Sequence, residues 1–151
     1  MQAQDIMNNV VFKVKETDTV RLVVEKFLEH HISGVPVINN NDEIVAYISD
    51  GDIMRHIGKH DDIFIDSFFF INVVHGDDDK FEERVKKILD LNVLKVAKKT
   101  VVKVEWNEDI ENIAATLGKR QIKKLPVERD GKLIGIISRG DVIRHVFHTF
   151  I

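Results

Sequence analysis

The sequence predicts an α/β (α+β) fold in which one β-α-β-β-α unit occurs twice. The chain's only two prolines stand in matching segments, Val35-Pro36-Val37 and Leu125-Pro126-Val127, 90 residues apart. Each half also carries a helical stripe of apolar residues, three short β-rich runs and a Ser-x-x-Asp motif. Self-similarity at a long period indicates a duplicated unit. We therefore expect two repeats, residues 1–57 and 93–151, packed about a pseudo-two-fold axis and separated by residues 58–92, which include one helix.

The composition narrows the class of protein. Of the 151 residues, 44% are hydrophobic and 31% charged, which is typical of a soluble globular domain. The absence of cysteine excludes disulfides, thiolate zinc sites and a cysteine nucleophile. No apolar run approaches the roughly 18 residues that span a bilayer, and Met1 to Val10 does not resemble a signal peptide, so we expect a cytoplasmic protein. A net charge of −3 argues against non-specific nucleic-acid binding.

An amphipathic pattern predicts the first helix of each repeat. Apolar residues recur at spacings of three and four from Val20, and again 90 residues later from Ile110. Thr19 and Asp109 are expected N-caps, because a short side-chain oxygen can accept a hydrogen bond from the first helical turn. Residues 10–14 and 100–104 precede these helices and predict short strands.

Two strands and a second helix are expected to complete each repeat. A polar turn joins the two strands in both copies, and Asp130-Gly131 in the second copy is a strong hairpin signal. A second helix is predicted to begin at Asp52 and again at Asp141. The predicted strands cover residues 34–38, 44–48, 125–128 and 133–137.

The segment between the repeats has no internal counterpart. Phe81, Val85 and Ile88 form an apolar stripe that predicts a helix, and Asp77-Asp78-Asp79 places negative charge at its start, where the helix dipole favours it. Residues 63–71 are unusually aromatic. We expect them to pack against the repeat core or a partner subunit, and an aromatic platform for a ligand is the alternative.

The Ser-x-x-Asp motif is the most informative feature for function. Ser49 with Asp52, and Ser138 with Asp141, stand where a strand is expected to lead into a helix. A hydroxyl and a carboxylate at a helix start lie beside exposed backbone N–H groups, an arrangement that suits a nucleotide. The carboxylate can accept from ribose hydroxyls, while the other groups donate to phosphate. The alternative is that the pair only caps the helix, since the spacing is close to a capping box.

In this order and twice over, the motifs resemble the tandem CBS family, the cystathionine β-synthase domain pair also called a Bateman module. The resemblance rests on Ile32-Ser33-Gly34-Val35-Pro36-Val37 with Ile48-Ser49-Asp50-Gly51-Asp52-Ile53, and on their second copies from Lys123 and Gly135. It implies that AMP, ADP, ATP or S-adenosylmethionine binds in clefts between the repeats. It also implies a non-catalytic regulatory module with no required cofactor, a homodimer and a regulated partner protein.

The resemblance further implies which residues line the clefts. Asp52 and Asp141 would hold ribose hydroxyls, and Ser49 and Ser138 would meet phosphate. The adenine would lie near Val10, Val11, Val35, Thr100, Val101 and Leu125.

The repeats differ in charge beside these positions. Lys123 and Lys124 stand where the first repeat has Ser33-Gly34, and Arg139 stands where it has Asp50. Solvated surface charge is one interpretation. The other is that the second cleft better suits a phosphorylated ligand, and it would comprise Lys124, Ser138, Arg139 and Asp141.

Other chemistries lack a supporting pattern. The histidine pairs at 30–31, 56–60 and 145–148 have no third ligand at a characteristic metal spacing. The glycines form no phosphate loop and no dinucleotide fingerprint. The main alternative to a nucleotide sensor is a structural, dimerisation or protein-interaction module without bound nucleotide. An enzyme, or a nucleic-acid binder using Lys95, Lys98, Lys99 and Lys103, is more distant.

Overall fold

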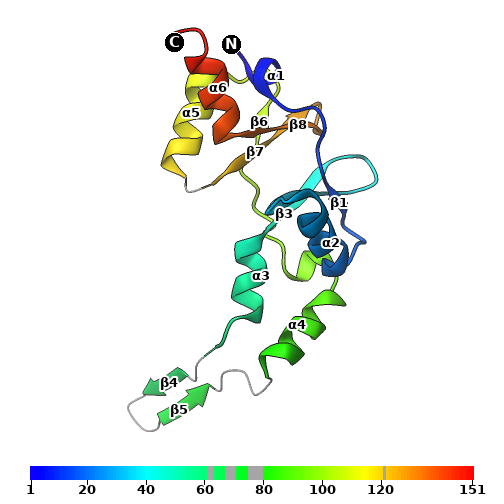
Figure 1. Ribbon diagram of the computed structural model, residues 1–151. Helices are drawn as coiled ribbons and strands as arrows, with labels where there is room; N and C mark the ends of the chain where they lie inside the picture. Colours follow the sequence, from blue (N-terminus) through cyan, green and yellow to red (C-terminus); the bar gives the residue numbers. More distant parts are fainter. Residues whose placement is uncertain (61–62, 67–70, 75–79, 121) are drawn as a thin grey trace.

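Each half of the chain forms a three-stranded sheet with two helices, which confirms the predicted α/β fold class (Figure 1). The computed structural model describes residues 1–60, 63–66, 71–74, 80–120 and 122–151. The first repeat contains β1 (Val14–Lys15), α2 (Val20–His30), β2 (Gly34–Ile38), β3 (Ile44–Ser49) and α3 (Asp50–Ile57). The second contains β6 (Val104–Glu105), α5 (Ile110–Lys119), β7 (Lys124–Arg129), β8 (Lys132–Ser138) and α6 (Arg139–Phe147).

The two sheets have the same topology and register. β1 pairs in parallel with β2, and β2 pairs antiparallel with β3; β6, β7 and β8 repeat this order. Val14 lies opposite Val37, and Val104 lies opposite Val127, 90 residues further on. Side chains alternate between the two faces of a strand. In β3 this alternation buries Ala46 and Ile48 in the core and leaves Tyr47 and Ser49 on the other face.

Several predicted boundaries shift. The first strand of each repeat has two residues, so residues 10–13 and 100–103 lie outside the sheets. α3 and α6 begin two residues earlier than expected, because Ser49 and Ser138 are the N-caps. Thr19 and Asp109 occupy N-cap positions, but neither side chain makes a capping hydrogen bond within the described chain.

The opening segment of each repeat packs into the core of the other repeat. In α1 (Ala3–Ile6), Ala3 and Ile6 are buried in the second core, where the backbone N–H of Ala3 donates to the carbonyl of Glu108 at 2.9 Å. In η1 (Val93–Lys95), Val93 is buried in the first core and donates to the carbonyl of Asp18, also at 2.9 Å. The two hydrophobic cores therefore do not follow the division of the sequence into residues 1–57 and 93–151.

Backbone bridges between the repeats reveal the pseudo-two-fold relation. Asn8 pairs with Ile136, and Lys98 pairs with Tyr47, the equivalent residues with the repeats interchanged. Glu43 pairs with Lys132, its own equivalent, so the two hairpin turns meet close to the pseudo-two-fold axis. This arrangement brings the segments that precede β1 and β6 alongside the opposite repeat.

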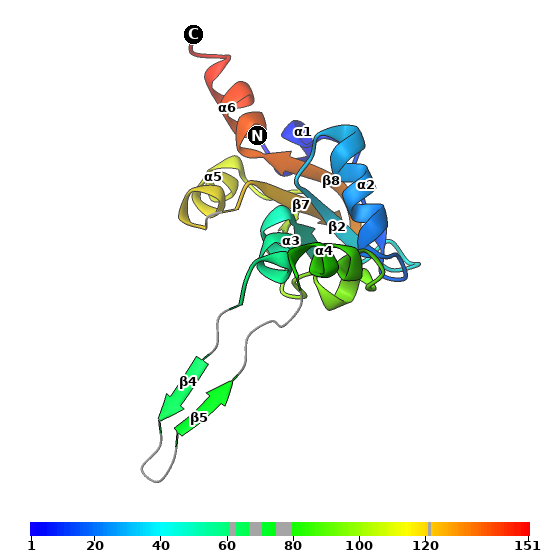
Figure 2. The same cartoon turned by 60° about the horizontal axis from the view of Figure 1, so that its bottom comes forward.

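The middle segment holds the predicted helix and an unpredicted hairpin. α4 (Phe81–Leu89) packs against α2 and α3 and buries Ile88 in the first core. β4 (Ile63–Asp66) and β5 (Ile71–Val74) form an antiparallel pair that projects away from both sheets in Figures 1 and 2, so their backbone does not lie on the repeat core. Residues 67–70 and 77–79 lie outside the described residues. Packing of the aromatic segment on a partner therefore stays a prediction.

No helix in the described ranges combines the length and apolar character that a bilayer-spanning helix needs.

Candidate functional site

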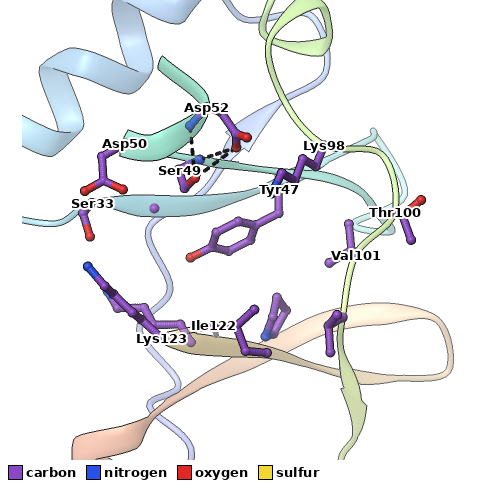
Figure 3. A pocket seen from close by; sticks show the side chains of 14 residues that line it. Ser33, Tyr47, Ser49, Asp50, Asp52, Lys98, Thr100, Val101, Ile122 and Lys123 are labelled. Carbon is purple, nitrogen blue, oxygen red and sulfur yellow. Dashed lines mark hydrogen bonds between the residues drawn. The ribbon is translucent and has the colours of Figure 1, made fainter. Parts of the chain in front are cut away.

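A cavity of about 310 Å³ lies between the repeats (Figure 3). The first repeat contributes the ends of β2 and β3 and the start of α3 to its lining. The second contributes residues 98 and 100–102, which precede β6, and residues 122–124 and 126 at the start of β7. This volume lies within the range of small-ligand pockets, which commonly combine apolar walls with a few placed polar groups.

Strand alternation decides which side chains face the cavity. Gly34 on β2, and Lys124 and Pro126 on β7, line it. Val35 and Leu125, which the sequence analysis placed beside the adenine, are 0% exposed and belong to the two cores. They were misplaced because successive side chains along a strand point to opposite faces.

The first Ser-x-x-Asp corner lies in the cavity wall. Asp52 Oδ2 accepts from the backbone N–H of Ser49 at 2.9 Å and from its hydroxyl at 3.1 Å. Asp52 Oδ1 accepts from Arg55 at 2.6 Å. In return, Ser49 Oγ accepts from the backbone N–H of Asp52 at 3.4 Å, which completes a capping box.

The second corner repeats this geometry. Asp141 Oδ2 accepts from the backbone N–H and the hydroxyl of Ser138, both at 2.8 Å, and Oδ1 accepts from Arg144 at 2.6 Å. Burial raises the pKa of the Asp141 carboxyl, but the hydrogen bonds from Ser138 and Arg144 outweigh burial and hold that pKa below its ordinary value. The carboxylate is thus well stabilised in its ionised form.

Both motifs therefore cap helices, and a further role in holding a ribose stays a prediction. A carboxylate has about four lone-pair sites for hydrogen bonds. In each corner, Ser and Arg side chains and the Ser backbone fill three of them. A ribose hydroxyl bound here would use the remaining site or replace the arginine. The side chain of Asp52 is 4% exposed and that of Asp141 is 18% exposed, so the second carboxylate is the more accessible.

Three lysines of the second half give the cavity its positive charge. Lys98, Lys123 and Lys124 line it, and none of their ammonium groups has an ion pair or hydrogen bond to a residue that the structure describes. Asp50 and Asp52 are the acidic residues of the lining. An anionic ligand would find three uncommitted donors here.

The structure does not place the basic residues at 123, 124 and 139 in one cleft, as the comparison of the two repeats had suggested. Lys123 and Lys124 were assigned to a cleft with Ser138 and Asp141, but they line the cavity of the Ser49–Asp52 corner. Arg139, counted with them, donates instead to the carbonyl of Leu117 on α5 at 3.1 Å. The pseudo-two-fold packing causes the difference, because it sets β7 of one repeat across from β3 of the other.

The remaining residues that were expected to bind the ligand lie on both sides of the pseudo-two-fold axis. Thr100 and Val101 line the cavity, and their contact with an adenine stays a prediction. Val10 and Val11 precede β1 at the equivalent positions and are not among its lining residues; Val10 is 71% exposed. Ser138, Arg139 and Asp141 are likewise outside the lining.

Tyr47 is a lining residue that the sequence analysis missed. Burial, reinforced by the nearby charges of Asp50 and then Asp52, raises the pKa of its phenol to about 12. A signal was present in the sequence. Tyr47 stands two positions before Ser49 and so on the same strand face, and the second repeat has Ile136 in its place.

The histidines show no metal site in the described part of the chain, where no three metal-ligating side chains cluster. His145 Nδ1 lies 2.8 Å from the carbonyl of Asp141, and His60 Nε2 lies 2.7 Å from that of Arg55.

Comparison with known proteins supports the duplication. The family model described as CBS domain matches residues 3–59 and 93–148. An uncharacterised Methanocaldococcus jannaschii protein, MJ1426, is 30% identical over 151 residues, covering 95% of this chain and 89% of its own. The Arabidopsis thaliana protein CBSX1 is 31% identical over 136 residues, covering 87% of this chain and 57% of its own.

Solved structures show the same fold. The structure of CBSX2 in complex with AMP superposes with a TM-score of 0.73 at 24% identity, covering 99% of this chain and 98% of that one. Hypoxic Response Protein I, solved with two coordinated zinc ions, superposes with a TM-score of 0.69 at 21% identity, covering 97% of this chain and 99% of that one.

Proposed function

Because the chain belongs to the CBS domain family, we propose that it is a regulatory module that binds an adenine nucleotide, or another adenosyl ligand, in the cavity between its repeats. The observation that carries the proposal is the meeting of the Ser49–Asp52 corner with Lys98, Lys123 and Lys124 around one cavity. The AMP complex of CBSX2, which has the same fold, supports this choice of ligand class. The proposal assigns the chain no catalytic step.

The geometry supports separate binding regions in the cavity for the phosphate and for the nucleoside of the ligand. The three ammonium groups have no partner among the described residues and are available to phosphate oxygens. Charge-assisted contacts of this kind are stronger than neutral hydrogen bonds. Thr100 and Val101 supply a mixed polar and apolar wall for the nucleoside. Residues from both repeats would touch one ligand, so binding favours the relative position of the repeats that fits the ligand best.

Thermal unfolding in the presence of AMP, ADP, ATP, S-adenosylmethionine and NAD tests the proposal. A ligand at 100 times its Kd stabilises the folded state by about 2.7 kcal/mol. Isothermal titration calorimetry then gives the Kd for the ligand that stabilises the protein most. Silence across the panel would contradict nucleotide binding.

Lysine variants show whether binding occurs in this cavity. Lys123→Gln and Lys124→Gln remove charges that hold no described structural contact, and each lost charge-assisted contact should weaken binding roughly 10- to 150-fold. Lys119→Gln, at the exposed end of α5, is the matched control. Equal affinity in all three variants would place the ligand elsewhere.

A structural or dimerisation module without nucleotide is the second candidate. It is favoured by the two capping boxes, which explain both Ser-x-x-Asp motifs without a ligand. Exposed apolar side chains on and beyond α6, including Ile143, Phe147 and Phe150, offer a surface for a second copy or a regulated partner. Light scattering beside the thermal unfolding panel separates the two candidates: a dimer that no ligand of the panel stabilises supports the structural one.

A further inference from the structure

Tyr47 extends from β3 into the cavity, between the walls that the two repeats provide (Figure 3). It is the only tyrosine of the chain. Its ring is half-buried, and in Figure 3 it reaches from its strand toward the side where Ile122 and Lys123 lie. A ligand that fills this space would touch the ring.

Gly34 makes room for the ring. A Cβ atom at position 34 would lie 2.5 Å from Tyr47 Oη and 2.9 Å from Cε1, so any side chain there would displace the tyrosine. The equivalent positions of the second repeat hold Lys124 and Ile136. The first repeat thus has a large aromatic ring beside a glycine, whereas the second repeat has an isoleucine beside a lysine at the same positions. The aromatic surface belongs to one side of the pseudo-two-fold axis.

The backbone fixes Tyr47 at the contact between the repeats. Its N–H donates to the carbonyl of Lys98, and its carbonyl accepts from the N–H of Lys98, both at 2.9 Å. Lys98 leads directly to Thr100 and Val101 in the opposite wall. The backbone that carries the ring is therefore held in place before a ligand arrives, which lowers the entropy cost of binding.

The hydroxyl of Tyr47 is uncommitted. It has no hydrogen bond to any residue that the structure describes, and it lies in the lining of the cavity. The phenol is protonated at neutral pH, as an ordinary tyrosine also is, so it can donate. A heteroatom acceptor on a ligand would satisfy it.

We propose that Tyr47 recognises the planar base of the ligand, through the face of its ring and through its hydroxyl, while the lysines hold the anionic end. In Figure 3, Lys98 and Lys123 lie on different sides of the ring, so charge is available beyond a base that stacks on it. This inference rests on the nucleotide-binding function proposed above and adds a specificity determinant to it. It makes the Tyr47 side of the axis the base-recognising side.

Calorimetry with AMP, ATP and inorganic tripolyphosphate tests the role of Tyr47. Tyr47→Ile installs the residue of the second repeat and should weaken AMP and ATP roughly 5- to 150-fold, the value of one base–aromatic stack. Tyr47→Phe keeps the ring and should weaken them about 2- to 10-fold. Tripolyphosphate has no base, so its affinity should stay within about twofold in both variants. Trp106→Phe is the control for an aromatic side chain outside the cavity lining.

A spectroscopic measurement on the unaltered protein complements the variants. With ring-¹³C-labelled tyrosine, the chain gives the signals of one tyrosine ring, which need no assignment. The ring current of a stacked base should shift these signals with AMP and leave them nearly unmoved with tripolyphosphate. This readout does not depend on whether a variant folds.

The outcomes separate this inference from the function on which it rests. If the unaltered protein binds no nucleotide, the proposed function and the role of Tyr47 are both wrong. If it binds AMP but Tyr47→Ile leaves the Kd within about twofold, or the ring signals do not move, only the role of Tyr47 is wrong. An equal loss of tripolyphosphate binding would show that the ring acts on the shape of the cavity, which also overturns base recognition.

Discussion

Asp141 accepts a hydrogen bond from Arg144 at 2.6 Å, one turn further along α6. The same carboxylate closes the capping box with Ser138, so one side chain joins the start of the helix to its second turn. Three interactions thus depend on a single negative charge, and each is weakened when that charge is neutralised.

We predict that Asp141 makes stability depend on pH in acid. Its pKa is lower in the folded protein than in the unfolded chain. Its contribution is therefore complete above the ordinary carboxyl pKa of about 4 and is lost as the pH falls through the lower folded value. In urea unfolding, the stability advantage over Asp141→Asn should shrink between about pH 5 and pH 2. Glu111→Gln on exposed α5 is the control; a constant advantage at all pH values would contradict the prediction.

Gly34→Ala should destabilise the protein by about 1–3 kcal/mol, the usual cost of forcing extra volume into a packed site. The added methyl group meets the ring of Tyr47. The cost should fall in a Tyr47→Ile background, because the obstructing ring is gone. Chemical unfolding of the single and double variants measures this coupling, and additive effects would show that the two residues do not interact.

Gly118→Ala should stabilise the protein by about 0.4–1 kcal/mol. Gly118 lies within α5, and a Cβ atom there would have nothing within 4 Å. Alanine restricts the unfolded chain and favours the helix without creating a clash. Thermal unfolding checks the sign, and a lower melting temperature would mean that α5 needs glycine for a reason outside its own geometry.

The opening segment of each repeat packs in the core of the other repeat, so we predict that truncating it destabilises the opposite core. Ile6→Ala and Val93→Ala each remove a buried side chain, and for the isoleucine the expected loss is about 2–5 kcal/mol. Because Ile6 packs in the second core, hydrogen exchange should speed up in residues 110–147 more than in residues 14–57. Val93→Ala should show the reverse, since Val93 packs in the first core. If each variant instead speeds hydrogen exchange in the repeat to which it belongs in sequence, the opening segments do not stabilise the opposite cores.

Local patterns were sufficient for much of the fold. The stripe from Val20 predicted α2, and the capping geometry at Ser49 was one of the two interpretations of its motif. Such features depend on residues a few positions apart, whose relative geometry a helix or a strand determines almost alone. Short two-residue strands were harder to predict, because a β-rich segment pairs only as far as its neighbour runs beside it.

The cavity was only partly predictable. Thr100, Val101 and the two lysines at 123–124 were expected near a ligand, and they do line the cavity. Val35 and Leu125 were assigned to the wrong face, and Tyr47 was not considered. Strand alternation corrects the first error. The second needs the opposite wall of the cavity, because an aromatic residue on a strand face also suits a packed core.

The sequence by itself determined the duplication, the order of elements within each β-α-β-β-α unit and the two Ser-x-x-Asp corners, because these arise from repeated local spacing. The tertiary structure alone decided which repeat each opening segment completes, and that Lys123 and Lys124 face the corner of Ser49 and Asp52. The physical reason is that two nearly equivalent units can satisfy the same local patterns in more than one pairing. Burial of Ile6 and Val93 in opposite cores, together with the bridges at Tyr47 and Ile136, selects one of them.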